Sequence, residues 1–154
     1  MFKKLNKRQE GFTIIEVMIV LAIAGVIMLV VFLAVPALQR NSRNTQRKSD
    51  AAHMSGLITE WQSNHGGVAL TKLNDSTNAA GPDLTNENFA IMAKPAANTA
   101  VAAWSAPATP AVDTFYVGTG ATCNGSTAVN TGGGSRSFVV VYYVEPGTTL
   151  QCAD

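Results

Sequence analysis

The sequence predicts an α+β protein in which a long N-terminal α-helix, apolar in its first half and amphipathic in its second, packs on a small antiparallel β-sheet. Two observations predict it. An uncharged aliphatic stretch near the N-terminus leads into a polar segment with apolar residues at helical spacing, and apolar runs near the C-terminus are separated by Gly- and Pro-rich turns. At 154 residues, the chain is long enough for one ordinary domain with an appendage.

The aliphatic stretch has the length of a membrane span. Residues 17–39 carry no charge, and as a helix they would extend roughly 35 Å, enough to cross a ~30 Å hydrocarbon core. A lone acid, Glu16, stands at the start of this stretch. A carboxylate inside the bilayer costs about 2.5–3.5 kcal/mol, although one close to the headgroups at a helix N-terminus is favoured by the helix dipole.

Two residues weaken the predicted helix. Pro36 removes a backbone hydrogen bond and clashes with the preceding turn, so we expect a kink or local melting there. Gly25 is a second weak point. The alternative is that Pro36 simply ends the membrane helix.

The polar segment that follows becomes amphipathic. Met54, Leu57, Ile58 and Trp61 recur at i, i+3, i+4 and i+7 and predict a helix face turned to a core. The "HGG" at 65–67 is typical of a helix end.

The middle of the chain, residues 68–112, is rich in Ala, Asn, Thr, Gly and Pro. We expect a variable loop region here, with a short helix at 85–93 and loop throughout 94–112.

The C-terminal residues predict a small antiparallel sheet. "DTFYVG" (113–118) and "SFVVVYYVEPG" (137–147) are typical of strands, and the nearly continuous apolar run of the second indicates a central strand covered on both faces. "TGGGS" (131–135) suits a hairpin-like loop, and residues 145–152 turn into a last short strand.

The charges are unevenly distributed. Basic residues flank the aliphatic stretch, whereas the chain from Ser49 onward has three basic residues against eight acidic ones. A mildly acidic body is a poor match for direct nucleic-acid binding, which needs positive charge on the folded domain.

No combination of residues indicates catalysis or a metal site. The two cysteines lack C-x-x-C spacing, no G-x-S-x-G or H-E-x-x-H occurs, and His53 and His65 border polar sequence. We therefore predict no enzyme activity, no cofactor and no metal. Cys123 and Cys152 would pair if the body is exported and would be free thiols in the cytosol.

The N-terminus resembles the class III signal of type IV pilins and related pseudopilins. A short basic leader ends in Gly11, and "FTIIEVMIVLAIAGVI" follows from Phe12. The resemblance is close over roughly the first 30 residues and loose beyond them. Ordinary signal-peptide cleavage near Ala34 and Ala37, and an uncleaved membrane anchor, are the alternatives.

The resemblance implies roles for particular residues. In that family a membrane peptidase cuts after the glycine and methylates the new N-terminus, which implies cleavage between Gly11 and Phe12 and methylation of Phe12. Glu16 would then pair with the α-amine of a neighbouring subunit and set the register of assembly. A C-terminal disulfide commonly closes the last loop in type IV pilins, and Cys123 with Cys152 fits that arrangement. Closing this loop would stabilise the fold by roughly 3.5 kcal/mol.

The resemblance also orders the segments. We expect a cleaved prepilin leader (1–11), a hydrophobic helix that spans the membrane before assembly and fills the filament core afterwards (12–39), an amphipathic helix (40–67), the variable loops (68–112), and a sheet with its disulfide loop (113–154).

The function implied is that of a structural subunit of a type IV pilus, a homo-oligomeric helical filament used in adhesion, motility or DNA uptake. Its partners would be the prepilin peptidase, the pilus assembly machinery and the membrane, with an extracellular filament as the final location. The alternatives are a minor pilin, a pseudopilin of a type II secretion or competence system, and a membrane-anchored binding module.

Overall fold

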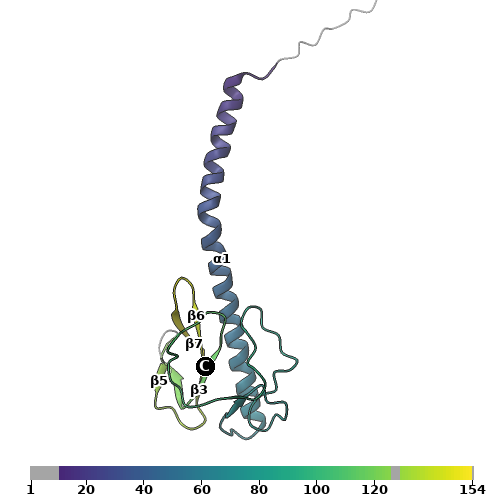
Figure 1. Cartoon of the computed structure of the whole chain (residues 1–154), viewed down its shortest axis with the longest axis vertical. Helices are drawn as coiled ribbons and strands as arrows, with labels where there is room; N and C mark the ends of the chain where they lie inside the picture. Colours follow the sequence, from purple (N-terminus) through teal and green to yellow (C-terminus); the bar gives the residue numbers. More distant parts are fainter. Residues whose placement is uncertain (1–10, 126–128, 154) are drawn as a thin grey trace, which may run out of the picture. The chain divides into compact units, whose positions relative to one another are not determined.

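The computed structural model describes residues 11–125 and 129–153. The chain divides into two compact units, Met1–Gln39 and Arg40–Asp154, and we call the second unit the head. Helix α1 (Ile14–Asn64) begins in the first unit and ends in the head, and the strands all belong to the head (Figure 1). Apart from Gly11, the expected leader lies outside the described residues.

In its described part, the first unit consists of residues 11–13 and the aliphatic half of α1. This part is long and apolar enough to cross a membrane, and none of its most apolar stretch is buried. The helix continues through both Gly25 and Pro36. The alternative that Pro36 ends the helix is therefore wrong, because a single missing hydrogen bond is a local loss that the intact turns on either side tolerate. A kink at Pro36 stays a prediction.

The head is built around the second half of α1. Its buried face is the predicted one, with Met54 and Ile58 fully buried, Trp61 4% exposed and Leu57 partly buried. The helix ends as the "HGG" indicates: Gly66 and Gly67 have φ of 67° and 75°, and the Gly67 N–H donates to the Gln62 carbonyl at 2.7 Å. This bond is the six-residue closure typical of a Schellman end, and it needs a left-handed residue at Gly66.

The main sheet is three-stranded and antiparallel, in the order β3 (Tyr116–Thr119), β6 (Phe138–Val144), β7 (Thr149–Ala153). The central strand β6 is covered on both faces, as its apolar run predicts. Val140 and Tyr142 pack with the helix residues, whereas Val139, Val141 and Tyr143 form a second core cluster on the other face.

Two smaller sheets complete the head. β1 (Lys72–Leu73) pairs with β2 (Thr99–Ala100), and β4 (Ala121–Cys123) pairs with β5 (Val129–Thr131), both antiparallel. The expectation of loop throughout 94–112 is therefore wrong at β2, because this two-residue strand leaves no periodic pattern. The β4–β5 hairpin was not predicted, and "TGGGS" links β5 to β6 rather than joining the two longer strands.

Two further expectations differ from the structure. The strand predicted at 113–118 is β3, which begins at Tyr116 and not at Asp113. Asp113 has a φ of 62°, which no strand residue adopts. The helix expected at 85–93 is absent. The backbone N–H groups of Ala90, Ile91 and Met92 donate instead to the Asp50 carboxylate of α1, and an N–H bound in this way cannot pair within a helix.

Candidate assembly site

The expected cleavage junction lies on exposed, non-helical chain. Gly11, Phe12 and Thr13 precede the first residue of α1, and Phe12 is 90% exposed. A methyl-sized group added to Gly11 would touch nothing. Within the described residues, the peptide bond between Gly11 and Phe12 therefore lies outside the helix and is not covered by other side chains.

Glu16 and Thr13 cap the start of α1 reciprocally. The Thr13 N–H and the Thr13 hydroxyl both donate to Glu16 Oε2, at 2.9 and 2.8 Å, and the Glu16 N–H donates to Thr13 Oγ1 at 3.4 Å. This arrangement is a capping box, in which a Thr at the N-cap and a Glu three residues later satisfy the free N–H groups of the first turn. The "TIIE" signature at 13–16 is readable in the sequence, but the capping role of Thr13 was not predicted.

The capping box uses only one of the two carboxylate oxygens of Glu16. Both contacts from Thr13 use Oε2, and Oε1 accepts no hydrogen bond from the described residues. A carboxylate can accept several donors, so Glu16 can cap its own helix and bind a cation at the same time.

The helix beyond Glu16 offers an uncovered apolar surface. The large apolar side chains from Phe12 to Leu38 are each exposed by 39% or more. A continuous apolar surface of this extent marks a membrane or protein contact.

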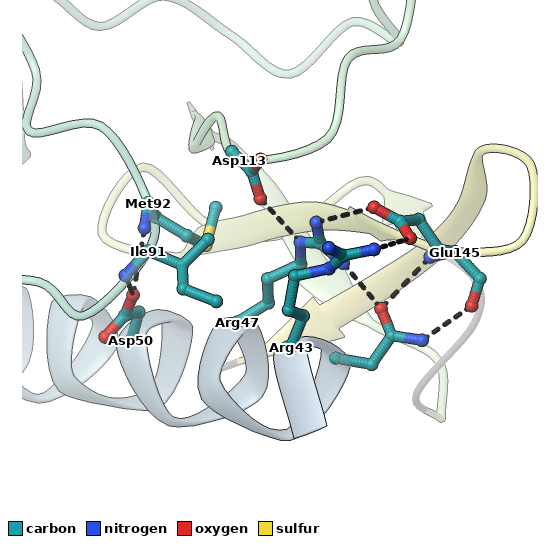
Figure 2. A network of polar contacts seen from close by, with 8 residues as sticks. Arg43, Arg47, Asp50, Ile91, Met92, Asp113 and Glu145 are labelled. Carbon is teal, nitrogen blue, oxygen red and sulfur yellow. Dashed lines mark hydrogen bonds and ion pairs between the residues drawn. The ribbon is translucent and has the colours of Figure 1, made fainter. Parts of the chain in front are cut away.

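In the head, Arg47 joins the helix to two distant segments. Its side chain is 1% exposed, Nε donates to Asp113 Oδ1 at 2.7 Å, and Nη2 donates to Glu145 Oε1 at 3.0 Å (Figure 2). Arg43, one turn earlier on α1, donates to the other oxygen of Glu145 at 2.7 Å. Burial alone would lower the pKa of Arg47, but its hydrogen bonds to Asp113 and Glu145 raise it. Arg43 and Arg47 lower the pKa of Glu145 through their hydrogen bonds.

Two more side chains of α1, Asn44 and Asp50, form hydrogen bonds with other parts of the head. Asn44 bonds both the backbone N–H and the carbonyl of Glu145. Asp50 accepts the N–H groups of Ala90, Ile91 and Met92 at 2.9, 2.9 and 3.0 Å, and Figure 2 shows the contacts with Ile91 and Met92. The helix therefore fixes the turn after β6 and the loop at 90–92 by polar and charged side chains.

Cys123 and Cys152 form a disulfide with their Cα atoms 5.7 Å apart. The bond joins the end of β4 to β7 and so ties the β4–β5 hairpin to the main sheet. No group of three or more His, Cys, Asp or Glu side chains in 11–125 and 129–153 is placed to hold a metal ion.

Comparison with known protein families gave a match to the N-terminal segment. A family model described as the prokaryotic N-terminal methylation motif matches residues 6–32. This motif is the class III signal peptide of type IV pilins. Comparisons with curated proteins and with solved structures gave no match.

The motif and the fold point to the same class of protein. One long apolar helix followed by small antiparallel sheets is consistent with a pilin-like α+β fold, and the motif supports a type IV pilin-like or pseudopilin-like protein. The motif further implies processing by a prepilin peptidase, and the apolar helix indicates membrane anchoring before assembly.

Proposed function

We propose that this chain is a structural subunit of a type IV pilus, which polymerises through α1 and displays the head on the filament surface. The observation that carries the proposal is the methylation motif at 6–32, which includes the start of a helix whose apolar surface nothing in the described chain covers. A simple tether needs the apolar helix but not the motif.

In this proposal the peptidase cuts between Gly11 and Phe12 and methylates the α-amine of Phe12. The new cationic amine then lies about one helical turn from Glu16 of its own chain. The Glu16 carboxylate of one subunit pairs with the amine of a neighbouring subunit, because an unpaired charge inside an apolar helix bundle is strongly unfavourable. This pairing sets the axial register of the filament.

The support for Glu16 as the acceptor is geometric. Glu16 Oε1 takes no hydrogen bond from the described residues, whereas Oε2 is held by Thr13. The carboxylate is thus fixed in position while one oxygen stays open to a second donor.

The N-terminus of the mature chain tests the proposal. Sheared surface filaments should contain this chain, and mass spectrometry of its N-terminal peptide should begin at a methylated Phe12. A Gly11→Val variant should keep the leader and form no filaments. A mature chain that begins at Met1, or one that begins after Ala37, contradicts the proposal.

A further inference from the structure

The main sheet has one covered edge and one open edge. Along the outer side of β3, the segment 93–104 forms parallel bridges near both ends of the strand, at Thr114 and Thr119. On the opposite side of the sheet β7 is the last strand, and no other strand of the described chain pairs with its outer side. The open edge is five residues long (Thr149–Ala153).

The N–H and C=O groups of Leu150 and Cys152 point out of the open edge. Successive residues of a strand direct these groups to alternate sides. Thr119 directs its groups to the covering segment, so by alternation Val141 of β6 bonds β3 and not β7. Cys152 is the β7 register partner of Val141, and Cys152 and Leu150 therefore face away from β6. Outside the sheet, the backbone of neither residue makes a hydrogen bond within the described chain.

This edge lacks the features that keep sheet edges from pairing. Proteins block free edges with charged side chains, prolines, bulges or a covering segment. Strand β7, "TLQCA", has no charged residue and no proline, and its continuous register with β6 leaves no bulge. On the other side of the same sheet, the segment 93–104 covers β3. The outer side of β7 is therefore a template for one more strand.

We propose that β7 pairs with β7 of a second copy of this chain, antiparallel and about a two-fold axis at Gln151. In this register Leu150 of each copy lies opposite Cys152 of the other, so the outward N–H and C=O groups of both residues are paired. A shift by two residues in either direction leaves one of these residues without a partner in β7. Gln151 lies opposite Gln151 of the other copy, and no like charges meet. The edge is thus complementary to itself, as an isologous contact requires.

The proposed pairing joins heads that run in opposite directions. The same residue lies opposite itself on one face of the extended sheet, so the two-fold axis is perpendicular to the sheet. Both copies then carry the head part of α1 on the same face, with its direction reversed in the second copy. Subunits of one helical filament are related head to tail and point the same way. The contact therefore goes beyond the proposed function: it links heads of two filaments that run in opposite directions.

Cysteine cross-linking of the full chain, in sheared filaments and in dodecyl maltoside micelles, tests this register. Gln151→Cys should form a disulfide between two copies under mild oxidation, because residues opposite each other at such a position have Cα atoms about 4.5 Å apart, within disulfide range. Thr149→Cys is the matched control on the same strand. Residue 149 lies opposite Ala153 of the other copy, so its two copies are about 14 Å apart and cannot bond. Mass spectrometry of the cross-linked peptide separates the new bond from exchange with the disulfide of Cys123 and Cys152.

Amide hydrogen exchange measured by NMR gives an independent readout. In concentrated chain, the N–H groups of Leu150 and Cys152 should exchange at least about tenfold more slowly than in dilute chain, because pairing must open before they exchange. The Gln151 N–H, which bonds β6, should be protected at both concentrations. Gln151→Lys places two ammonium groups opposite each other and should reduce the concentration dependence. Thr149→Lys, whose charges do not meet, should keep it.

Several outcomes overturn the proposal. Equal cross-linking of Gln151→Cys and Thr149→Cys, or none in Gln151→Cys, contradicts the register. Exchange at Leu150 and Cys152 that does not depend on concentration contradicts the pairing, and protection of these groups without the cross-link at residue 151 would assign the edge to another segment. Filaments that form without the cross-link refute this inference alone. A chain that forms no filaments refutes the proposed function, while cross-linking in micelles still tests the pairing.

Discussion

Thr13 donates both its backbone N–H and its hydroxyl to one oxygen of Glu16, so the acid at the start of the apolar helix has a partner within its own chain. The first turn of any helix leaves N–H groups unpaired, and inside a bilayer no water would satisfy them. Glu16 thus has a local role, the cap, which exists before any neighbouring subunit arrives. Its proposed role in assembly must be separated from this one.

Substitutions at the two residues make that separation. Glu16→Gln keeps a capping residue at the third helical position but removes the charge, so we expect normal membrane insertion and no filaments. Thr13→Ala removes the cap, which costs about 1 kcal/mol, but keeps the carboxylate, so filaments should persist in reduced number. Electron microscopy of filaments and the membrane-bound fraction of the chain are the measurements.

Glu60→Gln, on the exposed face of the same helix within the head, is the control and should change neither quantity. Filaments at the wild-type level in Glu16→Gln, together with their loss in Thr13→Ala, would show that the cap and not the charge matters for assembly.

Arg47 should be the most sensitive charged position in the head. Arg47→Met leaves the Asp113 and Glu145 carboxylates without their buried partner, but both are partly exposed. We therefore expect a loss of about 2–3 kcal/mol, below the full cost of stranding a buried charge. Urea unfolding of the full chain in micelles, followed by tryptophan fluorescence, measures it. Arg43→Met should change little, since Arg43 is 47% exposed and Glu145 keeps its contact with Arg47; equal losses in the two variants would contradict this ranking.

The features that the sequence predicts are those with a local signal. The aliphatic stretch predicts the membrane-length helix, the spacing of Met54, Ile58 and Trp61 predicts its buried face, and the continuous apolar run at 137–147 predicts the doubly covered strand β6. Each of these patterns repeats with the period of its own element, and no knowledge of distant partners is needed.

The features that were missed depend on partners far apart in the chain. Asp50 takes the N–H groups of residues 40 to 42 positions away, and this contact overrides the helical tendency of 85–93. In the sequence, nothing distinguishes Arg47 from the other basic residues after the aliphatic stretch. In the structure, it contacts Glu145, which is 98 positions away. The strands β1, β2, β4 and β5 are two or three residues long, too short for an alternating pattern.

Asp50→Ala should release the loop at 90–92. The variant leaves three backbone N–H groups without their charged acceptor, and hydrogen bonds to charged groups are worth about 1.5–3 kcal/mol each. Amide hydrogen exchange at Ala90, Ile91 and Met92 should accelerate by at least about tenfold, while exchange in β6 changes less. Asp50→Asn keeps one carbonyl oxygen, so its exchange rates at residues 90–92 should fall between those of the wild type and of Asp50→Ala. An unchanged rate in Asp50→Ala would show that other contacts hold the loop.

Acid should destabilise the loop that Asp75 organises. Its carboxylate accepts the Thr77 hydroxyl, the Ala80 N–H and the Thr77 N–H, and these bonds lower the pKa of Asp75 to about 2 from 3.8. Between these values the unfolded chain binds a proton that the folded chain does not, so stability falls as the pH drops from about 4 toward 2. Asp75→Asn should flatten the pH dependence of the melting temperature in that window, and Glu60→Gln should leave it unchanged. A melting curve of Asp75→Asn with the wild-type pH slope would contradict the assignment.

The disulfide should matter most for the β4–β5 hairpin. Cys123 and Cys152 are separated by 29 positions, and a cross-link of that span contributes about 3.5 kcal/mol by restricting the unfolded chain. In the Cys123→Ser/Cys152→Ser double variant, we expect a comparable loss in the free energy of unfolding. The loss of local order should be uneven, because β4 and β5 pair mainly with each other whereas β6 is central in the main sheet. Hydrogen exchange of the full chain in micelles should therefore accelerate more at residues 121–123 and 129–131 than at 138–144. Uniform acceleration across both regions would mean that the cross-link stabilises the head only as a whole, without a particular role in docking the hairpin.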